Sequence, residues 1–374
     1  MAKITEGISN PFFTGTDIPG AFFCDREKET RILGQFITNG ANVVLLSPWG
    51  MGKTALVKHF CEMKQIKGEY NTIYVNLYGT RFEDEFIQEF RSALLSSPLG
   101  KKAAKLPPRP YVFEFFRFLE NSSKPNIVIF DEFQQIQTCP CRMAASLRSH
   151  IQAQTNTCFI YSGSDITLLS NMFSSYPEPF YKSSEVLALD IIPLETYLAF
   201  CKNNFELFGK SVEDDVIKSV YEIFYGNTAR MQEVMKMVFS RTKKGQAASR
   251  DTLLESIEDI LYGKDAQFRE TLNSLIHEKE RRVLYCIATE GLATGLTSSE
   301  IMKGYCLGSA SSVRNALRNL TDEKVGLVRR IGYKHYCLED KFLELWIDRR
   351  NSYLESKHER TTELFELQRK LWNE

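Results

Sequence analysis

The sequence predicts an α/β protein in which a parallel β-sheet is followed by a helical region and a C-terminal winged-helix domain. Three observations support this order. Residues 43–57 read as a short apolar strand, a glycine loop and a helix. Residues 127–132 form another apolar strand, which ends in two carboxylates, and residues 278–338 read as three helices followed by two short strands. Strands that alternate with helical segments are typical of a parallel sheet covered by helices.

The loop between the first strand and its helix has the pattern of a phosphate-binding loop. It reads Ser47-Pro48-Trp49-Gly50-Met51-Gly52-Lys53-Thr54-Ala55. Glycines permit the backbone angles that wrap N–H groups around an oxyanion, and the helix N-terminus adds its dipole. The pattern predicts that Lys53 contacts the β- and γ-phosphates and that Thr54 binds Mg²⁺. Ser47 replaces the usual first glycine, a change that we expect the loop to tolerate because that position only opens it.

The strand Ile127–Phe130 runs directly into Asp131 and Glu132. Open α/β folds place ligands at the carboxyl ends of their strands, where this pair and the glycine loop are both expected. We therefore predict that Asp131 holds Mg²⁺ through water, and that Glu132 is the base that orients the attacking water. Glu132 and Lys53 are the predicted catalytic residues. The alternative is an ordinary core strand that ends in a solvated acidic turn.

Composition excludes several classes of protein. The chain has 47 basic and 47 acidic residues, so any basic patch that attracts nucleic acid must be local. No apolar run approaches about 18 residues and no signal-peptide pattern is present, so we expect a cytoplasmic protein without a membrane span. Nine scattered cysteines suit a reducing compartment. Cys139 and Cys141 are expected to be free thiols in a turn rather than zinc ligands, because no second pair accompanies them.

Periodicity and turn residues predict the remaining elements. Residues 10–20 are a turn-rich entry segment, and Leu33, Phe36 and Ile37 have helical spacing. Further strands are expected at 72–77, 158–161 and 186–189. Helices are expected at 83–95, 111–119 and 143–151, with a basic, proline-rich loop at 97–110. After Pro193 only helices are expected, at 194–207, 213–224, 229–241 and 251–262.

The segment Phe23-Cys24-Asp25-Arg26-Glu27-Lys28-Glu29, followed by a helix and the glycine loop, makes the chain resemble the archaeal-type ATPase family. That family belongs to the STAND branch of AAA+-like (ASCE) P-loop ATPases. The resemblance covers roughly residues 10–350 and implies ATP as the ligand, a helical lid, and a role for Arg26 in covering the adenine. Asp25 stands where many members have glycine. A capped amphipathic helix is the alternative for this segment taken alone.

The resemblance also implies two sensors of the γ-phosphate. The strand at 158–161 ends in Ser162-Gly163-Ser164, where the family has a polar sensing side chain. Ser162 and Ser164 are both candidates, and a plain turn is the alternative. The lid segment Gly226-Asn227-Thr228-Ala229-Arg230 matches the place of a second sensor, although Thr228 replaces the usual proline. Arg230 either reaches the γ-phosphate or is a surface arginine in the first turn of a helix.

The C-terminal region has the element order of a winged helix. Thr297–Glu300 has the form of a capping box that opens the second helix, and the third helix is expected at 309–320. This third helix would enter the major groove if duplex DNA is bound. The segment 309–336 has a net charge of +4, which favours phosphate contacts. The candidate contacts are Arg314, Arg318, Arg329, Arg330 and Lys334. The alternative, implied by STAND-type proteins, is a protein contact or an autoinhibitory contact with the ATPase core.

We therefore predict four regions along the chain. These are an ATPase core at 1–190, a helical lid at 191–265, a winged-helix domain at 266–350 and a C-terminal helix at 351–374. The last of these has Leu364, Leu367 and Leu371 as its apolar anchors.

The predicted function is an ATP- and Mg²⁺-binding hydrolase that acts as a switch, whose nucleotide state repositions the lid and the winged helix. Slow turnover is expected, because such ATPases often receive an arginine finger from a partner. Arg142 and Arg148 are candidate fingers, although no motif supports either. One alternative is an Orc/Cdc6-like DNA-binding regulator that uses ATP as a clamp. The other is a signalling scaffold that forms homo-oligomers on ATP binding.

Overall fold

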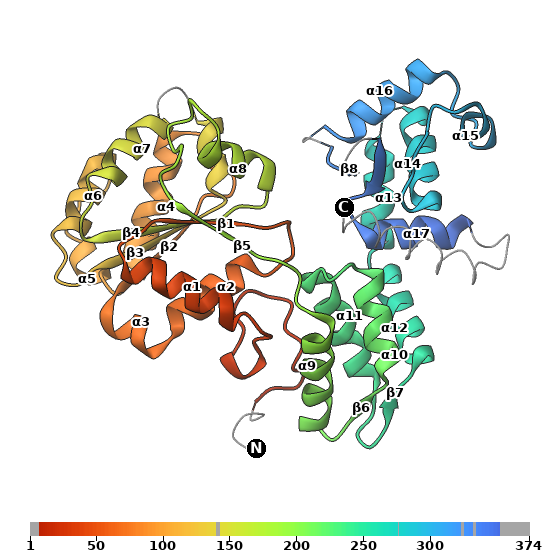
Figure 1. Cartoon of the computed structure of the whole chain (residues 1–374), viewed down its shortest axis with the longest axis horizontal. Helices are drawn as coiled ribbons and strands as arrows, with labels where there is room; N and C mark the ends of the chain where they lie inside the picture. Colours follow the sequence, from red (N-terminus) through yellow and green to blue (C-terminus); the bar gives the residue numbers. More distant parts are fainter. Residues whose placement is uncertain (1–6, 140–142, 276, 323–324, 332–333, 352–374) are drawn as a thin grey trace. The chain divides into compact units, whose positions relative to one another are not determined.

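The computed structural model describes residues 7–139, 143–275, 277–322, 325–331 and 334–351. The chain divides into two compact units (Figure 1). The first unit comprises Met1–Phe208 and Gly226–Lys236, and the second comprises Gly209–Tyr225 and Met237–Glu374. Cys141, Arg142, Lys324 and the apolar anchors of the predicted C-terminal helix lie outside the described residues.

Within the described residues, the first unit is built on a parallel sheet of five strands in the order β2-β3-β4-β1-β5. The strands are β1 (Val43–Leu46), β2 (Asn71–Asn76), β3 (Asn126–Asp131), β4 (Thr157–Tyr161) and β5 (Glu185–Ala188). The predicted α/β class with a parallel core is therefore confirmed. β4 pairs with both β1 and β3, so one strand separates the strand before the glycine loop from the strand that ends in carboxylates.

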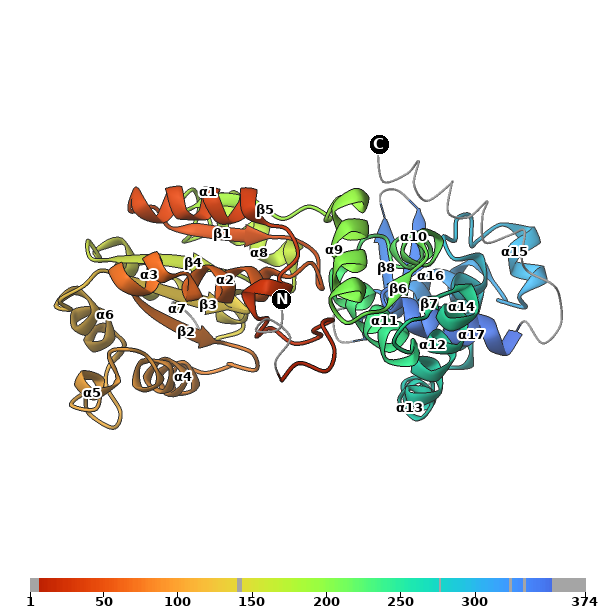
Figure 2. The same ribbon diagram turned by 90° about the horizontal axis from the view of Figure 1, so that it is seen from below.

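Helices cover both faces of this sheet (Figure 1), and Figure 2 shows the same layers from below. The helices of the first unit are α1 (Glu27–Thr38), α2 (Lys53–Glu62), α3 (Lys64–Glu69), α4 (Glu83–Ser96), α5 (Gly100–Ala103), α6 (Val112–Glu120), α7 (Met143–Gln152), α8 (Ile166–Ser174) and α9 (Leu194–Leu207), with the short 3₁₀ helices η1 (Gly20–Phe22) and η2 (Phe133–Thr138). The first nine residues of α11 (Thr228–Arg241) also belong to this unit.

Alternation along β3 explains why a hydrophobic cluster lies on each face of the sheet. Val128 and Phe130 join the cluster formed with α4, α6, α7 and α8, whereas Ile127 and Ile129 join the cluster formed with α1, α2 and α3. Phe130 is fully buried, and its ring lies 5.6 Å from that of Phe90, centroid to centroid. Because both faces are buried, the strand reads as a continuous apolar run. This packing fixes the position of Asp131, the last residue of β3.

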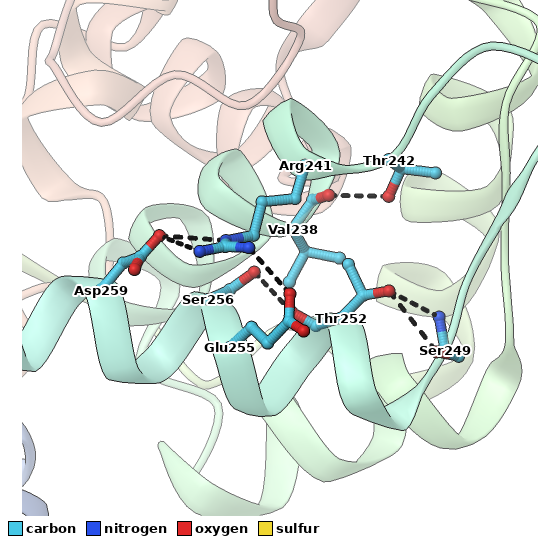
Figure 3. Close-up of polar contacts among 8 residues, drawn as sticks. All are labelled: Val238, Arg241, Thr242, Ser249, Thr252, Glu255, Ser256 and Asp259. Carbon is cyan, nitrogen blue, oxygen red and sulfur yellow. Dashed lines mark hydrogen bonds and ion pairs between the residues drawn. The ribbon is translucent and has the colours of Figure 1, made fainter.

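The second unit contains the rest of the helical region. Its elements before the winged helix are β6 (Ser211–Val212), α10 (Asp214–Ile223), the end of α11, β7 (Ala247–Ala248), α12 (Arg250–Gly263) and α13 (Asp265–Ser274). Figure 3 shows how Arg241, at the end of α11, pairs with two carboxylates of α12. Its guanidinium lies 2.8 Å from Glu255 Oε2, and its Nε donates to Asp259 Oδ2 over 3.0 Å. Because these pairs are partly exposed, they add little to stability.

The winged-helix order is confirmed at residues 278–338. It consists of α14 (Glu278–Glu290), α15 (Ser299–Gly304), α16 (Ala310–Leu320) and the antiparallel strands β8 (Val328–Ile331) and β9 (His335–Leu338), followed by α17 (Lys341–Asn351). The predicted register of the capping box is wrong by one residue. Ser298, not Thr297, caps α15, because its hydroxyl accepts from Ile301 N over 3.3 Å.

Candidate functional site

The glycine loop lies at the carboxyl end of β1. Gly50 and Gly52 have φ values of +84° and +89°, in the left-handed region that favours glycine. The first bond of the α2 ladder runs from Leu56 N to Gly52 O, so the three preceding N–H groups have no acceptor within the helix. The loop and the start of α2 therefore present backbone donors at one helix end, which is the arrangement that binds anions.

Lys53 is the first residue of α2, and its side chain is only 8% exposed. Its ammonium folds over the loop and donates to the carbonyl oxygens of Ser47 and Pro48, at 2.6 and 3.0 Å. Burial lowers the pKa of Lys53 to about 8, and the carboxylates of Glu132 and Asp131 oppose this shift only in part. Lys53 is thus a buried cation directed at the loop, with two acidic neighbours.

Asp131 ends β3, and its carboxylate accepts from four donors. Oδ1 accepts from the Ser162 hydroxyl at 2.6 Å and from Glu132 N at 3.2 Å. Oδ2 accepts from the Thr54 hydroxyl at 3.0 Å and from the Tyr74 hydroxyl. The structure therefore brings together Thr54, Asp131 and Ser162, which the sequence placed at the ends of three different segments. Their hydroxyl and carboxylate oxygens are ligands of the type that Mg²⁺ prefers.

Tyr74 was not identified from the sequence. It lies on β2, next to β3, and the register pairs it with Ile129, two residues before Asp131. Burial and the Asp131 carboxylate raise the pKa of Tyr74 well above its ordinary value, so its hydroxyl stays protonated and donates. A tyrosine between Ile73 and Val75 of β2 was the available signal.

Glu132 follows Asp131 with φ of +57°, a left-handed conformation that is uncommon for a residue with a side chain. This turn directs its carboxylate toward the end of β4. Its Oε2 accepts from Gln134 Nε2 at 2.6 Å, from the Ser164 hydroxyl at 2.7 Å and from Ser164 N at 3.2 Å. Gln134 is a second residue that the sequence did not single out.

The two predicted arginines also contact the loop. Arg26 is 4% exposed, pairs with Glu29 at 2.6 Å and donates to Met51 O at 3.2 Å. The Arg230 guanidinium lies 4.8 Å from the centre of the Trp49 ring. Arg230 also lies 3.5 Å from Glu233 Oε2.

The start of α11 is hydrogen-bonded directly to the glycine loop. Ala229 N donates to Gly50 O at 2.9 Å, and Asn227 Nδ2 donates to Trp49 O at 3.0 Å. A Cβ built on Gly50 would lie 2.5 Å from Asn227 Oδ1, so this approach requires glycine there. The sequence pointed to this segment through Arg230 and did not identify Asn227, which donates to the loop backbone.

The basic candidates of the winged helix lie in the second unit. Arg314 and Arg318 are exposed, four residues apart on α16, and so share one face. Arg330, on β8, and Lys334, just before β9, are exposed, and Arg329 lies 3.5 Å from Glu339. Arg148, the candidate arginine finger that lies within the described residues, is half-buried on α7.

No helix in the described part of the chain has both the length and the apolar character that crossing a bilayer requires.

Two family models match this chain. Residues 23–234 match the model of an ATPase domain found predominantly in archaea. Residues 266–349 match the model of a probable winged helix domain. The first match includes every residue predicted at the nucleotide site, from Arg26 to Arg230.

One curated relative is the replication factor C small subunit 2 of Pyrobaculum aerophilum. It is 25% identical over 224 residues, which span 59% of this chain and 60% of that protein. A solved Walker-type ATPase of Pyrococcus abyssi is 18% identical, with a TM-score of 0.66 over 90% of this chain and 99% of that one. The Aeropyrum pernix ORC2 protein, solved in ADPNP–ADP complexes, is 17% identical, with a TM-score of 0.53 over 87% and 93%. At these identities the two structures show a shared fold.

Proposed function

The chain belongs to the ATPase domain family found predominantly in archaea, and we propose on this basis that it binds ATP at the glycine loop and hydrolyses it to ADP and phosphate. The observation that carries this proposal is the convergence of a buried lysine and two carboxylates at one edge of the sheet. Lys53 comes from α2, whereas Asp131 and Glu132 come from the end of β3. An ordinary core strand with a solvated acidic turn would leave Asp131 exposed, but it is 7% exposed and bonded to four donors.

The loop would hold the phosphates of ATP. The N–H groups at the start of α2 are donors without helical acceptors, and the Lys53 ammonium can exchange its loop carbonyls for phosphate oxygens. Thr54 and Asp131 would hold Mg²⁺, which when bound neutralises charge on the β- and γ-phosphates. Arg26 and Arg230, which flank the loop, would contact the nucleotide at its rim.

Glu132 would act as the general base. Ser162 would sense the γ-phosphate and pass a change there to Asp131 through its hydrogen bond. A carboxylate within reach of a water is the usual acceptor of its proton, and such a base contributes roughly 10²–10⁴-fold to the rate. Ser162 is 1% exposed and its hydroxyl lies 2.6 Å from Asp131 Oδ1. A change in the contacts of Asp131 would therefore reach the end of β4 through one hydrogen bond.

We infer that hydrolysis operates a switch through α11. This helix begins in contact with Trp49 and Gly50 of the loop, and its last five residues belong to the second unit. A nucleotide that shifts the loop would change the contacts of Asn227 and Ala229. Because a helix transmits displacement along its axis, the second unit would sense that change.

The pKa of Lys53 predicts a pH dependence of ATP binding. Its value of about 8 means that the ammonium loses its proton as pH rises through 8, and a neutral lysine does not attract phosphate. We expect the Kd for ATP to rise above this pH by up to roughly tenfold per pH unit. A Lys53→Arg chain should show a flatter profile, because arginine stays protonated. Titration of ATP binding between about pH 7 and 9.5 tests this, and identical profiles for both chains would contradict it.

The lowered pKa of Lys53 has the opposite effect on folding stability, which it raises as pH increases. Between about pH 8 and the ordinary value of 10.5, the unfolded chain keeps a proton on Lys53 that the folded chain has lost. Stability rises with pH wherever the unfolded state binds more protons, so this lysine favours the folded state increasingly over that window. Weaker ATP binding above pH 8 would therefore not reflect unfolding caused by Lys53.

A DNA-binding regulator that holds ATP as a clamp is the second candidate function, and the exposed arginines of α16 favour it. If duplex DNA is the partner, an Arg314→Ala/Arg318→Ala chain should bind it more weakly and lower the salt slope by about 2. Arg250→Ala, which changes an exposed arginine on α12, is the matched control. Duplex binding and phosphate release should be measured together. If the wild type ignores DNA in both, the winged helix is assigned to a protein contact instead.

A further inference from the structure

A basic segment between α4 and α6 takes no part in the nucleotide site. From residue 92 to residue 113 the chain has four basic residues and no acidic one. These four are Lys101, Lys102, Lys105 and Arg109. All of them are exposed, and none forms an ion pair with another residue that the structure describes. On a chain with equal numbers of acids and bases, the segment is therefore a local positive field.

We propose that an exposed patch around α5 binds single-stranded nucleic acid. This α5 patch consists of Lys101, Lys105, Arg109, Tyr111 and Phe113, and a small pocket lies beside it. The proposal does not rest on ATP hydrolysis. It concerns a surface of the first unit, whereas the candidate DNA contacts of the winged helix belong to the second.

The pocket places this surface at the edge of the sheet opposite the glycine loop. Ser122 lines the pocket, and its hydroxyl donates to Oδ1 of Asn126, the first residue of β3, at 3.0 Å. The parallel strands begin at this edge, whereas the glycine loop follows the end of β1. Figure 2 shows α5 beside α4. A ligand of the α5 patch would therefore not compete with a nucleotide for space.

The backbone beneath the basic side chains is held by the rest of the unit. Leu99 and Ala103 are 5% and 1% exposed, so they anchor α5 in the core. Nε of Arg91, on α4, donates to Pro107 O at 3.3 Å. Arg109 stands between two prolines, which restrict its backbone. Little backbone entropy is lost when a ligand binds to a segment that is already fixed.

Two aromatic rings extend the α5 patch. Tyr111 and Phe113 are 73% and 45% exposed, and their rings are nearly parallel, with an angle of 13° and centroids 5.8 Å apart. Tyr111 N donates to Glu114 Oε2 at 2.7 Å, which fixes the backbone of Tyr111 at the start of α6. Exposed rings beside basic side chains are the platform on which the bases of a single strand stack.

The rings favour a single strand over other anionic partners. The bases of a duplex are paired and stacked on one another, so the side of a duplex offers phosphates but no base face to an exposed ring. An acidic peptide would pair with the basic side chains and leave the rings unused. An unpaired strand uses both, because its phosphates meet the cations while its bases stack on the rings in a sequence-tolerant way.

The pocket beside the patch supplies further donors. It has a volume of about 240 Å³, and Lys102, Arg117 and Asn121 line it together with apolar side chains. Glu114 also lines it, but its Oε2 already accepts from Tyr111 N. Within the described residues, neither Lys102 nor Arg117 forms an ion pair. A phosphate group of the bound strand would meet these two cations there.

The first test removes charge from the α5 patch of the full chain. Binding of a fluorescent oligothymidylate of about 20 nucleotides is measured by anisotropy at several salt concentrations. Each phosphate contact of a single strand contributes about 0.7 to the slope of log K against log salt, so Lys101→Ala/Lys105→Ala should flatten the slope by about 1.4. Lys28→Ala/Lys64→Ala, which changes two exposed lysines of α1 and α3, is the matched control.

The second test removes the rings without changing charge. Tyr111→Leu/Phe113→Leu should raise Kd for the oligothymidylate roughly fivefold or more and leave the salt slope unchanged. Tyr262→Leu, which changes a tyrosine of α12 that is 83% exposed, is its control. All the substituted side chains are exposed, and melting temperatures check that each variant is folded.

The outcomes separate this site from the nucleotide site and from the winged helix. Lys53→Ala and Arg314→Ala/Arg318→Ala chains should bind the oligothymidylate like the wild type, so a failure of the proposed ATPase function would leave this result intact. The proposal is overturned if the wild type does not bind the strand, or if folded patch variants bind it normally. It is also overturned if a duplex or polyglutamate binds more tightly than the strand and the leucine variant binds that ligand normally.

Discussion

Replacing Glu132 by glutamine is expected to lower kcat for ATP hydrolysis by roughly 10²–10⁴-fold, the usual contribution of a general base. ATP affinity should change little, because the hydrogen-bond partners of Glu132 are Gln134 and Ser164, outside the loop, and Lys53 keeps its two carbonyl contacts. The amide has nearly the shape of the carboxylate but cannot accept a proton from water. Phosphate release gives kcat, and a fluorescent ATP analogue gives affinity.

Glu89→Gln is the control for this substitution, since Glu89 is an exposed glutamate on α4, in the same unit. It should leave both kcat and affinity unchanged. The assignment of Glu132 as base fails if the Glu132→Gln chain turns over at the rate of the wild type. A chain that binds ATP tightly but turns over in neither form would instead favour the clamp described for the second candidate function.

The parts of the site that could be predicted from the sequence are those that strand geometry brings together. Apolar runs identified β1 and β3, and a parallel sheet places their carboxyl ends at one edge. Thr54, Asp131 and Ser162 therefore had to lie close together once the strands were correctly identified. The hydrogen bonds of Asp131 to Thr54 and Ser162 follow from that geometry.

The residues that the sequence did not predict make contacts that depend on the length of a side chain and on the space around it, not on a position at a strand end. Tyr74 contacts Asp131 because its ring extends across from the neighbouring strand, which no strand pattern encodes. Gln134 can donate to Glu132 only because the backbone of Glu132 is left-handed and because Gly163 leaves space for the glutamine side chain. Asn227, directly before α11, donates to the loop although it lies 178 residues beyond Trp49 in the chain. Such contacts depend on the tertiary arrangement and leave only weak signals in a single sequence.

Element ends were less predictable than element types for a similar reason. Thr297, Ser298 and Ser299 are all good helix caps, and the sequence favoured the first because glutamate follows three residues later. In the structure the hydroxyl of Ser298 accepts from Ile301 N instead. Competing caps of similar strength are separated by packing, not by propensity.

The largest loss of ATP binding is expected from Lys53→Ala. This change removes the buried ammonium that donates to the loop carbonyls of Ser47 and Pro48. Truncating one partner of a buried, hydrogen-bonded charge pair costs about 2–5 kcal/mol, which corresponds to a roughly 30-fold or greater rise in Kd. Binding of ATP with Mg²⁺ should be measured by calorimetry near pH 7, where Lys53 is protonated.

Lys64→Ala, on the exposed surface of α3, controls for the loss of a positive charge in general. Because burying an ammonium is costly, the Lys53→Ala chain should remain folded, and its melting temperature separates a binding defect from unfolding. An unchanged Kd in a folded Lys53→Ala chain would reject the phosphate assignment, and with it the proposed ATPase mechanism. A weakened Kd together with an unaffected Lys64→Ala would locate the nucleotide phosphates at the start of α2. Burial of a cation there would then be explained by function, since the folded chain alone gains little from it.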